Sequence, residues 1–203
     1  MASDNPFSNQ EIADYYNESC DHFGASHKAL GWSSAYTQEL RFFVLSLLGN
    51  WEGESVLDVG CGLGDFYAYL VKNELRFTYE GIDISPNMIA LAQKTQPKAD
   101  FKVLDILDSD FYKHYDYVVA SGAFTVRVND QYAYLKQNMQ KMYLLSKKAM
   151  AFNCLSNRAE QQDQDLLFYY DPVRVLEMAF ELSPYVEIRH HYLPNDFTVF
   201  VYK

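Results

Sequence analysis

The residues best suited to chemistry lie in one short stretch, residues 56–65. An apolar run leads to Asp58, and glycines follow at positions 60, 62 and 64, directly before a helical pattern. Alternating glycines let the backbone turn tightly and remove side chains that would block a flat ligand. A strand, a glycine-rich turn and a helix start together favour a nucleotide-like ligand in a doubly wound sheet.

Two kinds of nucleotide-like ligand use such a turn, and the spacing separates them. The dinucleotide pattern G-x-G-x-x-G/A seats a pyrophosphate on a helix N-terminus. Counted from Gly60 and Gly62, its third small residue would stand where this chain has Asp65. A carboxylate suits the positive end of a helix dipole but repels a phosphate. The turn therefore favours a positively charged ligand without phosphates and disfavours a dehydrogenase.

These residues, with three later stretches, resemble the class I S-adenosylmethionine-dependent methyltransferases. The first family motif, acidic-x-G-x-G-x-G, matches residues 58–64, and the acidic end of the second family strand matches Asp83. The resemblance continues through residues 101–106 and 115–122. It covers roughly residues 53–203.

The resemblance implies an α/β fold: a Rossmann-like, seven-stranded, mostly parallel sheet with a C-terminal antiparallel hairpin. Residues 1–52 would form an N-terminal helical cap and residues 53–203 the core. The alternation of hydrophobic patterns along the chain indicates the same architecture. Strands are expected at 55–59, 78–83, 100–104, 116–120, 149–154, 186–192 and 197–202. Helices are expected from Ser8 to about 16, from 33 or 34 to 48, and at 64–74, 86–95, 130–146 and 171–182, with loops at 17–33 and 156–168 and a short turn or helix at 108–113.

The resemblance also implies a cofactor, S-adenosyl-L-methionine, with S-adenosyl-L-homocysteine as its product. The backbone around Gly60 and Gly62 would contact the methionine part, and Asp58 would orient its ammonium group. Asp83 would accept from both ribose hydroxyls, and Asp105 from the adenine amino group. A simple strand-end cap is the alternative role for these last two. The full expected set is Asp58, Gly60, Cys61, Gly62, Gly64, Asp83, Ile84, Met88, Asp105, Ile106, Ser121 and Gly122.

The methyl acceptor would be read by residues 121–127, after the fourth expected strand. This segment lacks the Asn/Asp-Pro-Pro-aromatic signature that amino-methylating nucleic-acid enzymes carry there. The net charge of −10, without a basic stripe, also argues against a nucleic-acid substrate. We expect a small, neutral or cationic acceptor. The alternatives are a protein or peptide acceptor, and a non-catalytic S-adenosylmethionine-binding protein on the same fold.

In methyltransferases of this type, a helical segment caps the site. A high aromatic content, 16%, fits either an aromatic core or an aromatic-lined substrate cavity. Packing on the sheet edge is the alternative role for the cap. The residues expected to face the ligand are Tyr15, Tyr16, Trp32, Gln38, Arg41 and Phe124.

The sequence identifies no fixed catalytic residue. The methyl group of a sulfonium is already activated, so transfer needs mainly proximity and alignment. A general base is needed only if the acceptor arrives protonated. The candidates for a base are His22, His27, His190 and His191, and further polar candidates near strand ends are Asn153, Tyr169, Tyr170 and Asp171.

The remaining expectations concern metals, compartment and partners. The three cysteines, Cys20, Cys61 and Cys154, lack metal-ligand spacing, so we expect no metal site. Residues 1–6 show no signal region, and no apolar run approaches transmembrane length. We expect a cytoplasmic monomer or homodimer with a small-molecule substrate and neither nucleic-acid nor membrane partners.

Overall fold

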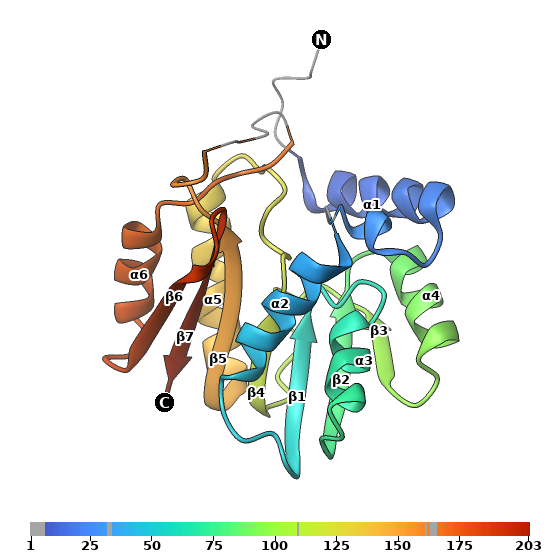
Figure 1. Ribbon diagram of the computed structural model, residues 1–203, viewed down its shortest axis with the longest axis horizontal. Coiled ribbons are helices and arrows are strands. Elements are labelled where there is room, and N and C mark those ends of the chain that lie inside the picture. The colour runs from blue at the N-terminus through green and yellow to red at the C-terminus, as the bar shows by residue number, and fades with distance from the viewer. Residues whose placement is uncertain (1–6, 32–33, 109, 161, 163–165) are drawn as a thin grey trace.

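The fold is organised around one seven-stranded sheet of order β3-β2-β1-β4-β5-β7-β6 (Figure 1). The computed structural model describes residues 7–31, 34–108, 110–160, 162 and 166–203. The first five strands run parallel, and β7 is antiparallel to both β5 and β6. The expected sheet and its C-terminal hairpin are thus confirmed. The strands are β1 (Glu54–Val59), β2 (Phe77–Asp83), β3 (Asp100–Val103), β4 (Tyr115–Ala120), β5 (Ser146–Leu155), β6 (Val186–Leu193) and β7 (Asp196–Tyr202).

Helices cover both faces of the sheet and bury a separate core on each. On one face, α2 (Ala35–Ser46), α3 (Asp65–Lys72) and α4 (Pro86–Thr95) pack over a core rich in aromatic side chains. On the other face, α5 (Gln131–Leu145) and α6 (Pro172–Phe180) pack over a core with more Leu, Met and Val. Two layers of helices thus leave the carboxyl ends of the strands as the edge where a ligand can bind.

The first helix, α1 (Asn9–Phe23), lies over those carboxyl ends (Figure 1). It begins with the expected capping box, in which Ser8 and Glu11 bond reciprocally. The expectation that residues 17–33 form a loop is wrong for 17–23, which extend α1, and for His27–Leu30, which form the short helix η1. The helix continues because Cys20 is buried in a small cluster with residues far along the chain, Leu63 and Met88.

Other boundaries differ by a few residues. In the described part of 108–113 there is a turn at position 110 and no helix, so the first of the two expected alternatives is present. β5 follows α5 without a connecting loop. Ser34 caps α2 and Ser85 caps α4, with Pro86 in the first helical turn, as expected. Among the described ranges, no helix has the length and apolar character needed to cross a bilayer.

Candidate active site

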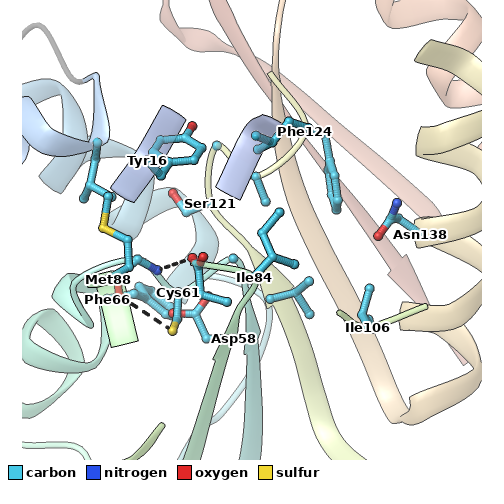
Figure 2. A pocket seen from close by; sticks show the side chains of 18 of the residues that line it. Tyr16, Asp58, Cys61, Phe66, Ile84, Met88, Ile106, Ser121, Phe124 and Asn138 are labelled. Atoms are coloured by element: carbon cyan, nitrogen blue, oxygen red, sulfur yellow. Dashed lines mark hydrogen bonds between the residues drawn. The ribbon is translucent and has the colours of Figure 1, made fainter. Parts of the chain in front are cut away.

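A cavity lies at the carboxyl ends of β1, β2 and β4, beneath α1, η1 and α2. Every residue expected to bind the cofactor lines it, with the exception of Gly64. Figure 2 shows Asp58 and Cys61 below, Tyr16 and Phe124 above, and Ile106 and Asn138 at the end away from Met88. The structure thus gathers these residues, from positions that span most of the chain, around one cavity.

The glycine turn is shaped by two positions that need glycine. Gly60 and Gly62 have φ angles of 67° and 52°. A Cβ at Gly62 would also lie 2.5 Å from Leu30 Cδ2 of η1, and one at Gly60 would lie 2.6 Å from Ala123 Cβ. The N–H groups of Gly60 and Cys61 both donate to the Ile82 carbonyl oxygen, at 2.8 and 3.0 Å. The turn is therefore fixed against β2, with bare backbone toward the cavity.

Gly64 serves a different purpose from the other two glycines. It is the N-cap of α3, with φ 77°, and does not line the cavity. A Cβ there would lie 2.6 Å from Phe101 Cζ in the aromatic core. The third glycine therefore allows α3 to pack closely on the sheet, whereas its expected cofactor contact remains a prediction.

Asp83 joins the glycine turn to the start of α4. Its Oδ2 accepts from Gly62 N–H and its Oδ1 from Ser85 N–H, both at 2.9 Å. Burial raises the pKa of this carboxyl group, and the two N–H donors oppose that rise. A carboxylate has about four lone-pair sites, so both oxygens keep capacity to accept further hydrogen bonds, such as those of ribose hydroxyls.

Asp58 places a second carboxyl group in the cavity wall. Its side chain is 2% exposed, and Tyr79 Oη donates to its Oδ2 at 2.6 Å. Burial raises the Asp58 pKa to about 7, although the hydrogen bond from Tyr79 lowers it. The charge of Asp58 therefore changes close to neutral pH.

The third expected carboxylate, Asp105, connects the end of β3 to α1. Its Oδ1 accepts from Leu107 N–H at 2.9 Å, and its Oδ2 accepts from Asn9 Nδ2 at 2.7 Å. Ile84 and Ile106 lie in the wall beside it. This corner has apolar surfaces for a flat ring and one carboxylate at its edge.

Several residues of the cavity wall are not predicted from the sequence. Tyr134 and Asn138 project from α5, one turn apart, and Leu30 projects from η1. The four-residue spacing of Tyr134 and Asn138 equally fits the buried face of a helix, so the sequence alone does not assign these two residues to a cavity. The others that were missed are Ile12, Phe42, Val59, Phe66 and Leu104. Asp65 and Ala123, which also line the cavity, lie in the glycine turn and in the segment expected to read the acceptor.

The expected cap residues divide into two groups. Tyr16, Gln38 and Phe124 line the cavity, and Gln38 Nε2 donates to Asp65 Oδ2 at 2.8 Å. Burial raises the Tyr16 pKa well above its usual value. The structure places Tyr15 and Arg41 outside the wall, and Trp32 lies outside the described residues. Arg41 is buried, where its Nε donates to Asp196 Oδ2 at 2.8 Å.

The candidate bases whose side chains the structure describes, His22, His190 and His191, lie away from the cavity wall. His190 Nε2 is 2.6 Å from Ser156 Oγ, and its ring stacks on Phe197. His22 and His191 are exposed, and the side chain of His27 lies outside the described part of the structure.

The other polar candidates have structural partners. Tyr170 Oη donates to the Phe124 carbonyl oxygen, Asp171 caps α6, and Asn153 Oδ1 accepts from Gly122 N–H. Tyr169 is half-buried and is absent from the described wall. The sequence therefore leaves a general base unassigned, and the described wall adds no histidine to the candidates.

The charges of the wall have one sign. Its described residues include four carboxylates, at Asp58, Asp65, Asp83 and Asp105, and no Lys, Arg or His. Such a cavity attracts a cationic ligand. The cavity fits S-adenosylmethionine, which carries a sulfonium. It offers bare glycine backbone, acceptors for hydroxyl and ammonium groups, and an apolar corner for a flat ring.

Comparison with known proteins points to the same family. A family model described as a methyltransferase domain matches residues 56–143. Rv1506c of Mycobacterium tuberculosis, named as a methyltransferase, is 31% identical over 158 residues, covering 73% of this chain and 93% of that protein.

Solved structures share the whole fold. Magnesium protoporphyrin IX methyltransferase from Synechocystis PCC 6803, with bound S-adenosylmethionine, aligns with a TM-score of 0.72 at 15% identity, covering 96% of each chain. The [4+2]-cyclase SpnF aligns with a TM-score of 0.73 at 12% identity, covering 98% of this chain and 97% of that one. The family motif, the cavity and the mycobacterial relative together show that this chain belongs to the class I S-adenosylmethionine-dependent methyltransferases.

Proposed function

We propose that this methyltransferase transfers the methyl group of S-adenosylmethionine to a small molecule. The observation that carries the proposal is the cover over the cavity. Ile12 and Tyr16 of α1, with Gln38 and Phe42 of α2, form part of the wall. An acceptor must therefore enter beneath two helices, which suits a small molecule better than a folded protein or a duplex.

Polar contacts hold this cover on the strand ends. Asn9 of α1 bonds to Asp105, and Asn17 accepts from Ser85 Oγ at 2.8 Å. On the other side, Gln38 of α2 bonds to Asp65 at the start of α3. The cover thus contacts the same turns that are expected to hold the cofactor, so cofactor and acceptor would share one enclosed space.

The residues of the wall have separate roles in this proposal. S-adenosylmethionine supplies an activated methyl group. Gly60 and Gly62 leave room for its methionine part, Asp83 accepts from its ribose, and the corner beside Asp105 holds its adenine. Tyr16 and Phe124 restrict water and align the acceptor, because in-line transfer depends on proximity and orientation.

Two further observations support a small acceptor in a reducing compartment. The Synechocystis protein of the same fold is named for a small-molecule substrate, magnesium protoporphyrin IX. The cysteines, all buried, are free thiols, as is usual where disulfides do not persist. We propose that the protein acts in the cytoplasm, as a monomer or homodimer.

A labelling experiment tests the acceptor class. The protein is incubated with S-adenosylmethionine carrying a radioactive methyl group, in the presence of either the dialysable or the retained fraction of a cell extract. We expect label to enter only compounds of the dialysable fraction, and the Gly62→Val variant to transfer none. Label confined to protein in the retained fraction would establish the peptide alternative, and label in neither would favour a binding protein without catalysis.

A further inference from the structure

A row of polar side chains crosses the sheet under α2. Ser121 follows β4, Asn153 lies near the end of β5, and Thr198 lies on β7, directly paired with Asn153. The register of β4 on β5 pairs Ala120 with Phe152, so Ser121 comes next to Asn153. Alternation along β5 puts Asn153 on the same face as Ala151, which packs in the core beneath α2.

Hydrogen-bonding capacity is left unused at two members of this row. Asn153 is 1% exposed, its Oδ1 accepts from Gly122 N–H at 2.6 Å, and its Nδ2 has no partner among the described residues. Ser121 Oγ is also buried without a partner there. Thr198 differs, because its Oγ1 is 2.8 Å from Tyr192 Oη. Buried donors without partners are rare in folded proteins, so each one calls for a physical reason.

One of these two residues, Ser121, lies in the cavity wall, and Asn153 reaches the wall through its hydrogen bond to Gly122. Ser121 and Gly122 both line the cavity, and Figure 2 shows Ser121 in its central part, between Tyr16 and Ile84. One planar amide carries both polar atoms of Asn153, so its Nδ2 lies close behind the wall at Gly122. Anchoring the turn after β4 needs only the oxygen of this amide. The N–H groups of this amide keep their donor capacity directly behind the wall, next to Ser121.

We propose that Ser121 Oγ and Asn153 Nδ2 bind a neutral oxygen of the methyl acceptor, such as a carbonyl, amide or hydroxyl oxygen. This inference rests on the proposed function and narrows its substrate class. The amide N–H requires an acceptor atom, and the hydroxyl can complement it. A carboxylate or phosphate is disfavoured because the described wall holds four carboxylates and no cationic side chain. A bare ammonium ion offers no lone pair to either group.

The test uses the full chain saturated with S-adenosylhomocysteine and three single-ring probes: benzamide, benzoate and benzylammonium. Probe binding is followed by the side-chain amide resonance of Asn153 in heteronuclear NMR, assigned by its loss in Asn153→Asp. We expect benzamide to shift this resonance and to bind more tightly than benzoate. Benzylammonium, which the wall carboxylates attract, should leave the resonance unshifted. Ser121→Ala, measured at an S-adenosylhomocysteine concentration that saturates the variant, should weaken benzamide binding by about five- to twentyfold.

Controls separate this inference from the proposed function. Ser146→Ala removes a buried hydroxyl at the opposite end of β5, where its Oγ donates to Tyr143, and should leave benzamide binding unchanged. Tighter binding of benzoate, a shift of the Asn153 resonance by benzylammonium, no binding of benzamide, or no effect of Ser121→Ala would overturn the inference alone. Failure of the wild-type chain to bind S-adenosylhomocysteine would overturn the proposed function, and this inference with it.

Discussion

At the scale of single residues, the site is a set of carboxylates whose charges depend on their surroundings. Asp83 is surrounded by backbone N–H groups that favour its ionised form, whereas Asp58 is buried with one phenol. Asp105 is shared with a side chain of α1. The same residue type therefore has three different roles, set by its hydrogen-bond partners.

Asp83→Ala should weaken binding of S-adenosylmethionine by about 1–3 kcal/mol, because buried hydrogen-bond partners lose their acceptor. The Gly62 and Ser85 N–H groups would lose the carboxylate that accepts from them, and the ribose hydroxyls would lose the same acceptor. Titration calorimetry measures the change. Asp100→Ala, at an exposed carboxylate on β3, should bind as the wild type does. If Asp83→Ala and the wild type bound S-adenosylmethionine with equal affinity, Asp83 would not be a cofactor-binding residue.

Asp58 predicts a pH dependence of cofactor binding. Burial raises its pKa to about 7, so the free protein holds a proton there in mildly acid solution and loses it as pH rises. The ionised form attracts the cationic cofactor, so affinity should increase with pH through about 7. Binding should release protons near that pH, which calorimetry in two buffers detects. Asp58→Asn should flatten the profile, and an unchanged profile in that variant would exclude Asp58 as its cause.

At the scale of elements, the glycine turn and the cover meet directly. Leu30 of η1 packs on Gly62, while α1 is tied to the ends of β2 and β3 through Ser85 and Asp105. The small apolar cluster around Cys20 is separate from the two main cores. A substitution in the glycine turn should therefore displace η1 and α1 before it disturbs the sheet.

Gly62→Val should abolish cofactor binding and leave a folded protein. Its Cβ would meet Leu30 Cδ2 at 2.5 Å in a backbone conformation that L residues rarely adopt. Calorimetry measures binding, and circular dichroism measures folding. Gly53→Val is the matched control, because Gly53 has φ 77° but open space around it, before β1. A folded Gly62→Val variant with full affinity would contradict this account of the turn.

The sequence predicted the elements more completely than the contacts between them. Asp58 and the glycines predict a strand, a turn and a helix, because this pattern depends only on residues that are adjacent in the sequence. Residues 17–23 were missed because their burial depends on Met88 and Leu63, far along the chain. Leu30 and Asn138 carry no local sign that they face a cavity. The same limit applies to Arg41, whose partner Asp196 is 155 positions away.

At the scale of the whole molecule, a buried ion pair joins two elements that lie far apart along the chain. Arg41 of α2 and Asp196 of β7 are both under 5% exposed, and Tyr192 Oη also donates to Asp196. The pair lies on the face of the sheet that α2 covers. It therefore fixes part of the N-terminal cover to the C-terminal hairpin.

Asp196→Ala should lower the free energy of unfolding by about 3–5 kcal/mol, because it leaves the Arg41 charge buried without this partner. Urea denaturation measures the loss. Lys72→Ala removes an exposed pair between α3 and Glu39 of α2, and should leave the free energy of unfolding nearly unchanged because water screens this pair. Equal losses of unfolding free energy in the two variants would show that burial does not increase the contribution of the Arg41–Asp196 pair to stability.

The most direct measurement is calorimetric titration of the wild-type protein with S-adenosylmethionine, S-adenosylhomocysteine and NAD in parallel. The account predicts binding of the first two ligands at one site per chain, and none of NAD, because Asp65 stands where a dinucleotide turn needs a small residue. Binding of NAD without S-adenosylmethionine would contradict the central claim about the cavity. Binding of none of the three would show that the cavity does not hold this cofactor.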